Sequence, residues 1–157
     1  MKIKGRNPET GQEVQVEANS VDNDFLQAMI DFKMSDEEIK KSIDGLNISA
    51  DAKKLLYTFS KATIQAGQFV IKIGRKIIDF VCFVYKENPS ATFGVIFGAI
   101  AGFLIASIPI IGVVLGAVFT PIAIAIGLVG GVIQDLKDKE LARKIELINA
   151  QFSPLNG

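Results

Sequence analysis

The N-terminal residues alternate polar and apolar side chains in two short runs. In residues 2–4 and 14–16 every second side chain changes character, as in strands with one exposed face. Between these runs Pro8 restricts φ and Gly11 tolerates a positive φ, so the intervening residues suit a turn. The pattern predicts a β-hairpin over residues 1–19. Because two strands alone are marginally stable in water, we expect this hairpin to pack on a helix or a neighbouring subunit.

A helical period of 3.6 residues begins after this hairpin. Apolar residues at helical spacing predict a short amphipathic helix over residues 21–33. Ser35 and Glu38 form a capping box that starts a second helix, which ends at Gly45. Ser49 is the predicted N-cap of a third helix.

The apolar stripe of this third helix continues as far as Asn88, which precedes a proline. The pattern therefore predicts one amphipathic helix over residues 49–88, of about 35 helical residues and roughly 50 Å. Gly67 and Gly74 lie nearly on one face of it and mark a close contact or a bend.

Between Glu87 and Asp135 lie 47 residues without a charged side chain. Pro109 divides this block into residues 91–108 and residues 110–133. As helices these segments are about 27 and 36 Å long, close to the hydrocarbon thickness of roughly 30 Å. The pattern predicts a membrane-embedded helical hairpin, with the lipid bilayer as a partner.

Basic residues flank this block on both sides, whereas its central turn carries no charge. By the positive-inside rule, both termini are expected on the cytoplasmic side of a bacterial inner membrane. Basic and aromatic side chains near the two ends suit a membrane interface. The predicted interface residues are Arg75, Lys76, Tyr85, Lys86, Lys137 and Lys139.

Glycines recur at four-residue spacing along the uncharged block. In lipid, helices associate by close van der Waals contact, which small residues permit. Either the two arms of one hairpin pack together through these glycines, or neighbouring subunits do so as a homo-oligomer. The predicted packing residues are Gly94, Gly98, Gly102, Gly112, Gly116, Gly127 and Gly131.

A last amphipathic helix is predicted over residues 135–148, with its apolar stripe at Leu141, Ile145 and Ile148. The predicted fold is therefore mostly α, with flanking amphipathic helices and a small N-terminal β-hairpin. It divides into an N-terminal part, a long helix, a two-span hairpin and a C-terminal helix with tail. The corresponding ranges are 1–48, 49–88, 89–134 and 135–157.

Composition narrows the possible chemistry. The 157 residues include 17 basic and 17 acidic side chains, one cysteine and no histidine. Balanced charge argues against a nucleic-acid binder, and the missing histidine removes the commonest general base and metal ligand. A lone cysteine forms no intrachain disulfide. We therefore expect no enzymatic activity, no cofactor and no metal.

Residues 5–13 (Gly-Arg-Asn-Pro-Glu-Thr-Gly-Gln-Glu) resemble the DNA-inserting arm of HU-type histone-like proteins. That family's helices and basic saddle have no counterpart elsewhere in the chain. The same residues are ordinary turn formers, so Pro8 is not assigned as a DNA contact.

The layout of residues 50–150 resembles the pore-forming domains of colicins, in which amphipathic helices surround a central hydrophobic hairpin. The resemblance implies membrane insertion. The first hypothesis is an oligomeric membrane protein whose glycine-zipper hairpin forms a pore or membrane-perturbing assembly, of toxin, lysis or defence type. In the alternative, the hairpin anchors an adaptor whose residues 1–87 recruit a cytoplasmic protein. A third hypothesis is a soluble protein whose apolar hairpin is buried in a larger assembly.

Overall fold

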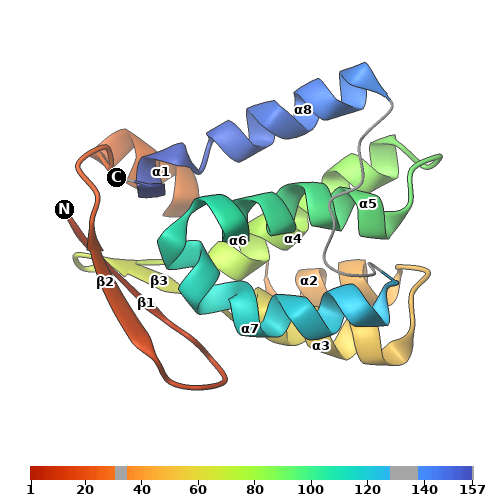
Figure 1. Cartoon of the computed structure of the whole chain (residues 1–157), viewed down its shortest axis with the longest axis horizontal. Coiled ribbons are helices and arrows are strands. Elements are labelled where there is room, and N and C mark those ends of the chain that lie inside the picture. Colours follow the sequence, from red (N-terminus) through yellow and green to blue (C-terminus); the bar gives the residue numbers. More distant parts are fainter. Residues whose placement is uncertain (31–34, 128–137, 157) are drawn as a thin grey trace.

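The computed structural model describes residues 1–30, 35–127 and 138–156. These residues are mostly helical, with a small antiparallel sheet at one end of the molecule (Figure 1). The sheet has the order β2-β1-β3-β4. Its strands are β1 (Lys2–Arg6), β2 (Glu13–Glu17), β3 (Ile64–Ala66) and β4 (Phe69–Ile71).

The predicted N-terminal hairpin is confirmed. β1 pairs with β2 in a register that runs from Lys2 opposite Glu17 to Arg6 opposite Glu13. In the turn, Gly11 has φ +73°, a value that favours glycine. The hairpin packs on a helix, as expected, because β1 contacts the helix α7 (Pro109–Ala125).

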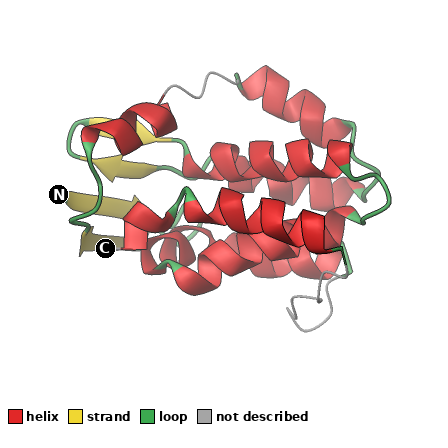
Figure 2. Ribbon diagram, turned by 90° about the horizontal axis from the view of Figure 1, so that it is seen from above, coloured by secondary structure: helices red, strands yellow, loops and turns green. Residues whose placement is uncertain are grey.

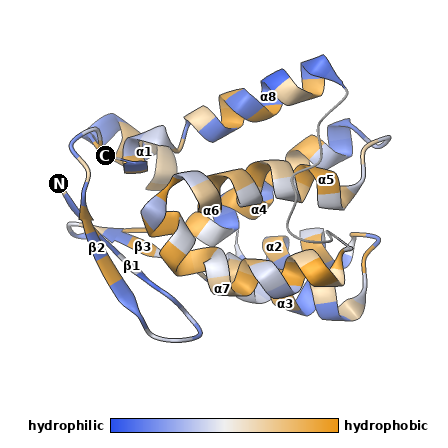
Figure 3. Ribbon diagram, in the orientation of Figure 1, coloured by the Kyte–Doolittle hydropathy of each residue, from blue (hydrophilic) through white to orange (hydrophobic). Residues whose placement is uncertain are grey.

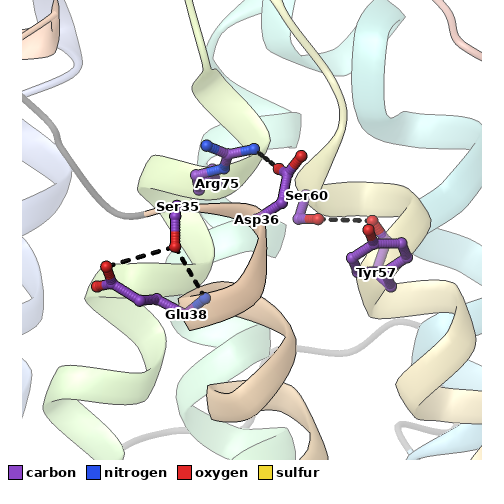
Figure 4. A network of polar contacts seen from close by, with 6 residues as sticks. All are labelled: Ser35, Asp36, Glu38, Tyr57, Ser60 and Arg75. Atoms are coloured by element: carbon purple, nitrogen blue, oxygen red, sulfur yellow. Dashed lines mark hydrogen bonds and ion pairs between the residues drawn. The ribbon is translucent and has the colours of Figure 1, made fainter.

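The first three helices begin close to the predicted positions. They are α1 (Asn23–Ile30), α2 (Asp36–Asp44) and α3 (Ala50–Ser60). Ser35 Oγ accepts the Glu38 N–H at 3.2 Å and donates to Glu38 Oε1 at 3.4 Å, so the capping box is confirmed (Figure 4). Ser49 likewise caps α3, because its Oγ accepts the Ala52 N–H at 3.2 Å.

The prediction of one continuous helix over residues 49–88 was wrong. α3 ends at Ser60, strands β3 and β4 follow, and α4 (Ile73–Glu87) starts anew. Gly67, with φ +60°, turns the chain between the two strands. β3 pairs with β1, so the sheet supplies hydrogen bonds that a continuous helix would make internally. The predicted end of the helical region before Asn88 is confirmed, because α4 stops at Glu87.

The uncharged block forms a helical hairpin, with Pro109 at the start of its second arm as predicted. The first arm runs without a break through α5 (Phe93–Phe97), the π-helix η1 (Gly98–Gly102) and α6 (Phe103–Ser107). The second arm is α7, which ends at Ala125. Both arms are shorter than the predicted segments 91–108 and 110–133, and residues 128–133 lie outside the described part.

Among the described residues, no helix combines the length and the apolarity that a bilayer crossing requires. Here the predicted membrane-embedded hairpin differs from the structure, because its inner faces pack against the protein's own elements. α7 packs on α3 and β1, and α6 packs on α7. Hairpin residues with no exposed surface are Ile96, Phe97, Ile100, Ala101, Leu104, Ile110, Ile111, Val114, Leu115, Val118 and Ile122.

The chain continues with α8 (Lys139–Ala150) and the short 3₁₀ helix η3 (Ser153–Asn156). α8 is amphipathic, as predicted, and buries Leu141, Ile145 and Ile148. It contacts η1 of the first arm. The first arm therefore lies between α8 on one side and α7 and α3 on the other (Figure 1). In both views the helices extend to one side of the sheet (Figures 1 and 2).

Candidate functional site

The uncharged hairpin, residues 93–125, is the candidate functional site because it occupies the centre of the core. Phe97 connects its two arms to α3. Its ring contacts Phe59 edge-on at 5.6 Å between centroids, and it stacks on Phe93 at 5.8 Å and on Phe119 at 5.5 Å. Such aromatic contacts are favourable beyond the area that they bury. The hairpin is therefore an integral part of this fold.

One side of α7 is left uncovered. Residues at three- and four-residue spacing along it are exposed or half-buried, and Ile124 has 73% of its surface exposed. We call this side the open face of α7. Its residues are Pro109, Val113, Gly116, Ala117, Thr120, Pro121 and Ile124. It carries no charged side chain, whereas the outer side of α8 is hydrophilic (Figure 3).

The predicted packing glycines fall into different environments. A Cβ at Gly112 would lie 2.7 Å from the Ile105 carbonyl oxygen, so Gly112 lets the two arms of one hairpin approach closely. At Gly116 a Cβ would meet nothing within 4 Å, because this residue is on the open face. Gly127 has φ +84° just beyond α7. Gly131 lies outside the described residues.

In the first arm, Gly98 is buried and Gly94 and Gly102 are half-buried. Gly98 and Gly102 are the two ends of the π-helix η1. Contact between subunits through any of these glycines stays a prediction.

The predicted membrane-interface residues also lie in different environments. Arg75 is buried and forms an ion pair with Asp36, at the start of α2 (Figure 4). The Tyr85 ring packs edge-on against Phe93, at 5.7 Å between centroids. Lys76 is half-buried, and its Nζ lies 5.3 Å from the centre of the Phe80 ring. These three side chains are therefore engaged within the molecule.

Lys86 and Lys139 are exposed, as an interface role requires. Lys137 lies outside the described residues.

Two asparagines hold the hairpin's covering elements, and the sequence patterns did not reveal either of them. Asn149 of α8 donates from Nδ2 to the Ala99 carbonyl of η1 at 3.3 Å. Asn7, in the β1–β2 turn, donates from Nδ2 to the Val113 carbonyl of α7 at 3.3 Å. Both side chains are buried. A usable signal for Asn149 is its position beside the apolar stripe of its helix.

Burial changes the titration of three side chains on α4. It raises the pKa of the Asp79 carboxyl, against the opposing charges of Lys76 and Lys86. It lowers the pKa of Lys76, against the opposing charge of Asp79. It raises the pKa of the Cys82 thiol to about 11. Cys82 is therefore a poor nucleophile at neutral pH.

The part of the chain that the structure describes contains no group of three or more acidic or cysteine side chains placed to hold a metal ion. A surface hollow of about 340 Å³ lies between α2 and α3, with Lys40, Lys53, Lys54 and Tyr57 among its lining residues. The hollow does not involve the hairpin.

Comparisons with protein-family models, with curated proteins and with solved structures find no match for this chain.

Proposed function

We propose that this protein inserts into membranes: it keeps its uncharged hairpin covered by amphipathic elements and transfers it into a lipid bilayer. There, copies assemble through the hairpin into a pore or another membrane-perturbing oligomer. One observation carries the proposal. A large part of the buried core comes from a hairpin within 47 consecutive uncharged residues, and one face of that hairpin, on α7, is left uncovered by the other described elements.

The transfer is energetically reasonable because the hairpin brings no charge into lipid. Each charged side chain at the centre of a membrane helix would cost about 2.5–3.5 kcal/mol, and residues 88–134 contain none. Its buried aliphatic and Phe side chains have apolar surroundings in either environment. The elements that cover the hairpin carry the charges, and they remain at the water interface.

Both arms of the hairpin have to lengthen in order to span the bilayer. The continuous first arm has 15 helical residues and α7 has 17, about 22 and 25 Å, below the roughly 30 Å of a bilayer core. Uncharged residues adjoin each arm, at 91–92 and 126–134, and are available to extend the helices. With the basic residues on both flanks, this insertion leaves both termini on the cytoplasmic side of a bacterial inner membrane.

Assembly uses the open face of α7. In lipid, helix association depends on close contact between small residues. Gly116 and Ala117 supply such a surface, and Gly116 has no contact within the molecule that a side chain would disturb. A substitution at Gly116 therefore tests assembly without disturbing the fold.

The test is dye release from vesicles of phosphatidylcholine and phosphatidylglycerol, with Gly116→Leu compared with wild type. Wild type is expected to release the dye, and Gly116→Leu is expected to reduce the release at least tenfold while melting no lower than wild type, since leucine favours a helix more than glycine does. The matched control is Ala150→Leu, which adds a similar side chain at an exposed position of α8 and should release dye like wild type.

Sealed vesicles with wild-type protein would overturn the proposal. If the protein nevertheless sediments with those vesicles, the hairpin is an anchor, and the adaptor hypothesis for residues 1–87 replaces the pore. If the protein stays in the supernatant, both membrane hypotheses fail.

A further inference from the structure

We infer that α8 is the releasable cover of the hairpin, held at the π-helical turn by Asn149, and that it detaches before any other covering element. The inference assigns a mechanism of uncovering to the proposed function, and only its last step, membrane entry, rests on that function. Detachment itself is a property of the molecule in water and is measured without lipid.

The contact between α8 and the first arm centres on η1. π-helical turns are rare and commonly mark functional sites, because their backbone hydrogen bonds depart from the α-helical pattern. The Ala99 carbonyl of this turn accepts Asn149 Nδ2 at 3.3 Å, a long bond. Asn149 is 91% buried, since its relative exposure is 9%. Its Oδ1 is buried as well and has no hydrogen-bond partner among the residues that the structure describes. α8 is therefore docked through its buried apolar stripe and through one polar side chain that is only half satisfied.

The corresponding contact on the second arm has the same length, but its asparagine is better satisfied. Asn7 donates to the Val113 carbonyl, and its Oδ1 also accepts the N–H groups of Glu9 and Thr10 at 2.9 and 3.2 Å. The strand that precedes Asn7 is paired on both sides, with β2 and with β3. Releasing the β-hairpin from α7 breaks the bond to Val113 and leaves the two bonds within the turn intact, whereas releasing α8 also exposes to water an oxygen that is buried without a partner among the described residues.

The remaining polar contacts of α8 are on the surface. Lys144 pairs with Glu87, and its Nζ lies 5.0 Å from the centre of the Phe83 ring. Glu87 and Phe83 are exposed, and Lys144 is at the border of exposure, so these contacts are screened by water and salt and hold α8 weakly. Beyond the far end of the helix, Phe152 packs edge-on against Phe80 at 5.8 Å.

The experiment compares Asn149→Asp with Leu147→Asp by hydrogen exchange of the full chain in the absence of lipid. Both variants add one negative charge to the same helix. Asp at position 149 keeps the shape of Asn but loses the donor and directs a carboxylate at the Ala99 carbonyl. Leu147 is 64% exposed, so Asp at that position faces water. At about pH 7, Asn149→Asp is expected to speed exchange of the α8 amides at least tenfold relative to Leu147→Asp, with β1 and α7 unchanged.

Acidification supplies a second readout. In acid the carboxyl introduced by Asn149→Asp becomes neutral, and its O–H can donate a hydrogen bond to the Ala99 carbonyl as the amide did. Exchange of the α8 amides in this variant is therefore expected to return to the Leu147→Asp level when both are measured at about pH 3.5. A general loss of stability would instead speed exchange of the β1 and α7 amides along with those of α8. Equal exchange in the two variants at neutral pH, or wild-type α8 amides as protected as those of β1, would overturn the inference.

Vesicles then test the last step. If α8 release precedes entry, Asn149→Asp releases dye at least tenfold faster than Leu147→Asp at about pH 7. Faster α8 exchange with unchanged dye release would contradict the link to membrane entry while leaving the releasable cover in place. Sealed vesicles with every variant would count against the proposed function.

Discussion

Gly74 lies directly against the backbone carbonyl of Phe59, and its N–H donates to the Ala62 carbonyl at 3.1 Å. The start of α4 is thereby fixed against the end of α3. A Cβ at position 74 would overlap the Phe59 carbonyl, and backbone atoms cannot yield as a side chain can. This contact exists because the chain reverses through β3 and β4 between the two helices.

Gly74→Ala is expected to lower the free energy of unfolding by about 2–3 kcal/mol, because the added methyl group forces α3 and α4 apart. Urea denaturation followed by circular dichroism measures the change. A variant as stable as wild type would mean that the two helices are not in this close contact.

The same substitution should have the opposite sign at Gly116. This residue is within α7, and a Cβ there meets only open space. Gly116→Ala is therefore expected to raise the free energy of unfolding by up to about 1 kcal/mol, since alanine favours the helix more than glycine does. The two variants are best measured side by side in the same urea series, where a destabilised Gly116→Ala would indicate that α7 is packed on this side too.

Phe97→Ala should be among the most disruptive substitutions in the hairpin. Phe97 has no exposed surface and contacts three other rings. Its removal is expected to cost about 3–5 kcal/mol through lost burial and the cavity left behind. Phe69→Ala on β4 is the control, because that ring is 47% exposed and its loss should cost less than about 1 kcal/mol.

Asp79 makes stability depend on pH. Burial raises the pKa of its carboxyl in the folded protein above the ordinary value of 3.8, so the folded state holds the proton more tightly than the unfolded state. The contribution of Asp79 to stability therefore falls as pH rises from about 4 through the folded pKa, and acid restores it. Asp79→Asn removes this dependence and raises stability at neutral pH by less than about 1 kcal/mol, since the carboxyl is only half-buried.

Thermal melts across this pH range measure the effect. Glu146→Gln, at an exposed position of α8, should leave the wild-type curve in place. A wild-type curve in Asp79→Asn would assign the pH dependence to other groups.

Cys82 reports on the opening of α4. With its pKa raised to about 11 from an ordinary 9.0, the thiol has about 100-fold less thiolate near pH 8 than in the unfolded chain, and it is also 95% buried, since its exposure is 5%. We therefore expect Ellman's reagent to label native protein at least 100-fold more slowly than protein in urea. Rapid labelling of the native protein would show that α4 opens locally.

Local signals in the sequence predicted the ends of most elements. Ser35, Ser49 and Pro109 each begin a helix through a backbone or side-chain property that acts within a few residues. The β1–β2 hairpin follows equally from alternation and turn chemistry. Such features depend on neighbouring residues alone, so they can be inferred without the fold.

The break of the predicted long helix depends on a distant partner. Two patterns fit this segment equally well. Ile64 and Ala66 suit the alternation of a strand, and Ala66 and Phe69 suit the apolar stripe of a helix. The choice between the two periods is made by pairing of β3 with β1, about sixty residues earlier in the chain. No local pattern contains that information.

The uncharged block was ambiguous for a different reason. A membrane span and the central helix of a protein core both require uninterrupted apolar surroundings, and residues such as Ile100 and Val114 suit either. Composition therefore identified the hairpin as the longest uncharged part of the chain but not what surrounds it. The asparagines that hold it were missed because a single amide gives no periodic signal.

The position of α8 after the hairpin has a consequence for synthesis. A ribosome synthesises both apolar arms before it has made Asn149 and the rest of their cover, whereas β1, β2 and α3 are already complete. For that interval the nascent chain presents the first arm uncovered. The slower the synthesis of residues 126–150, the longer that interval lasts.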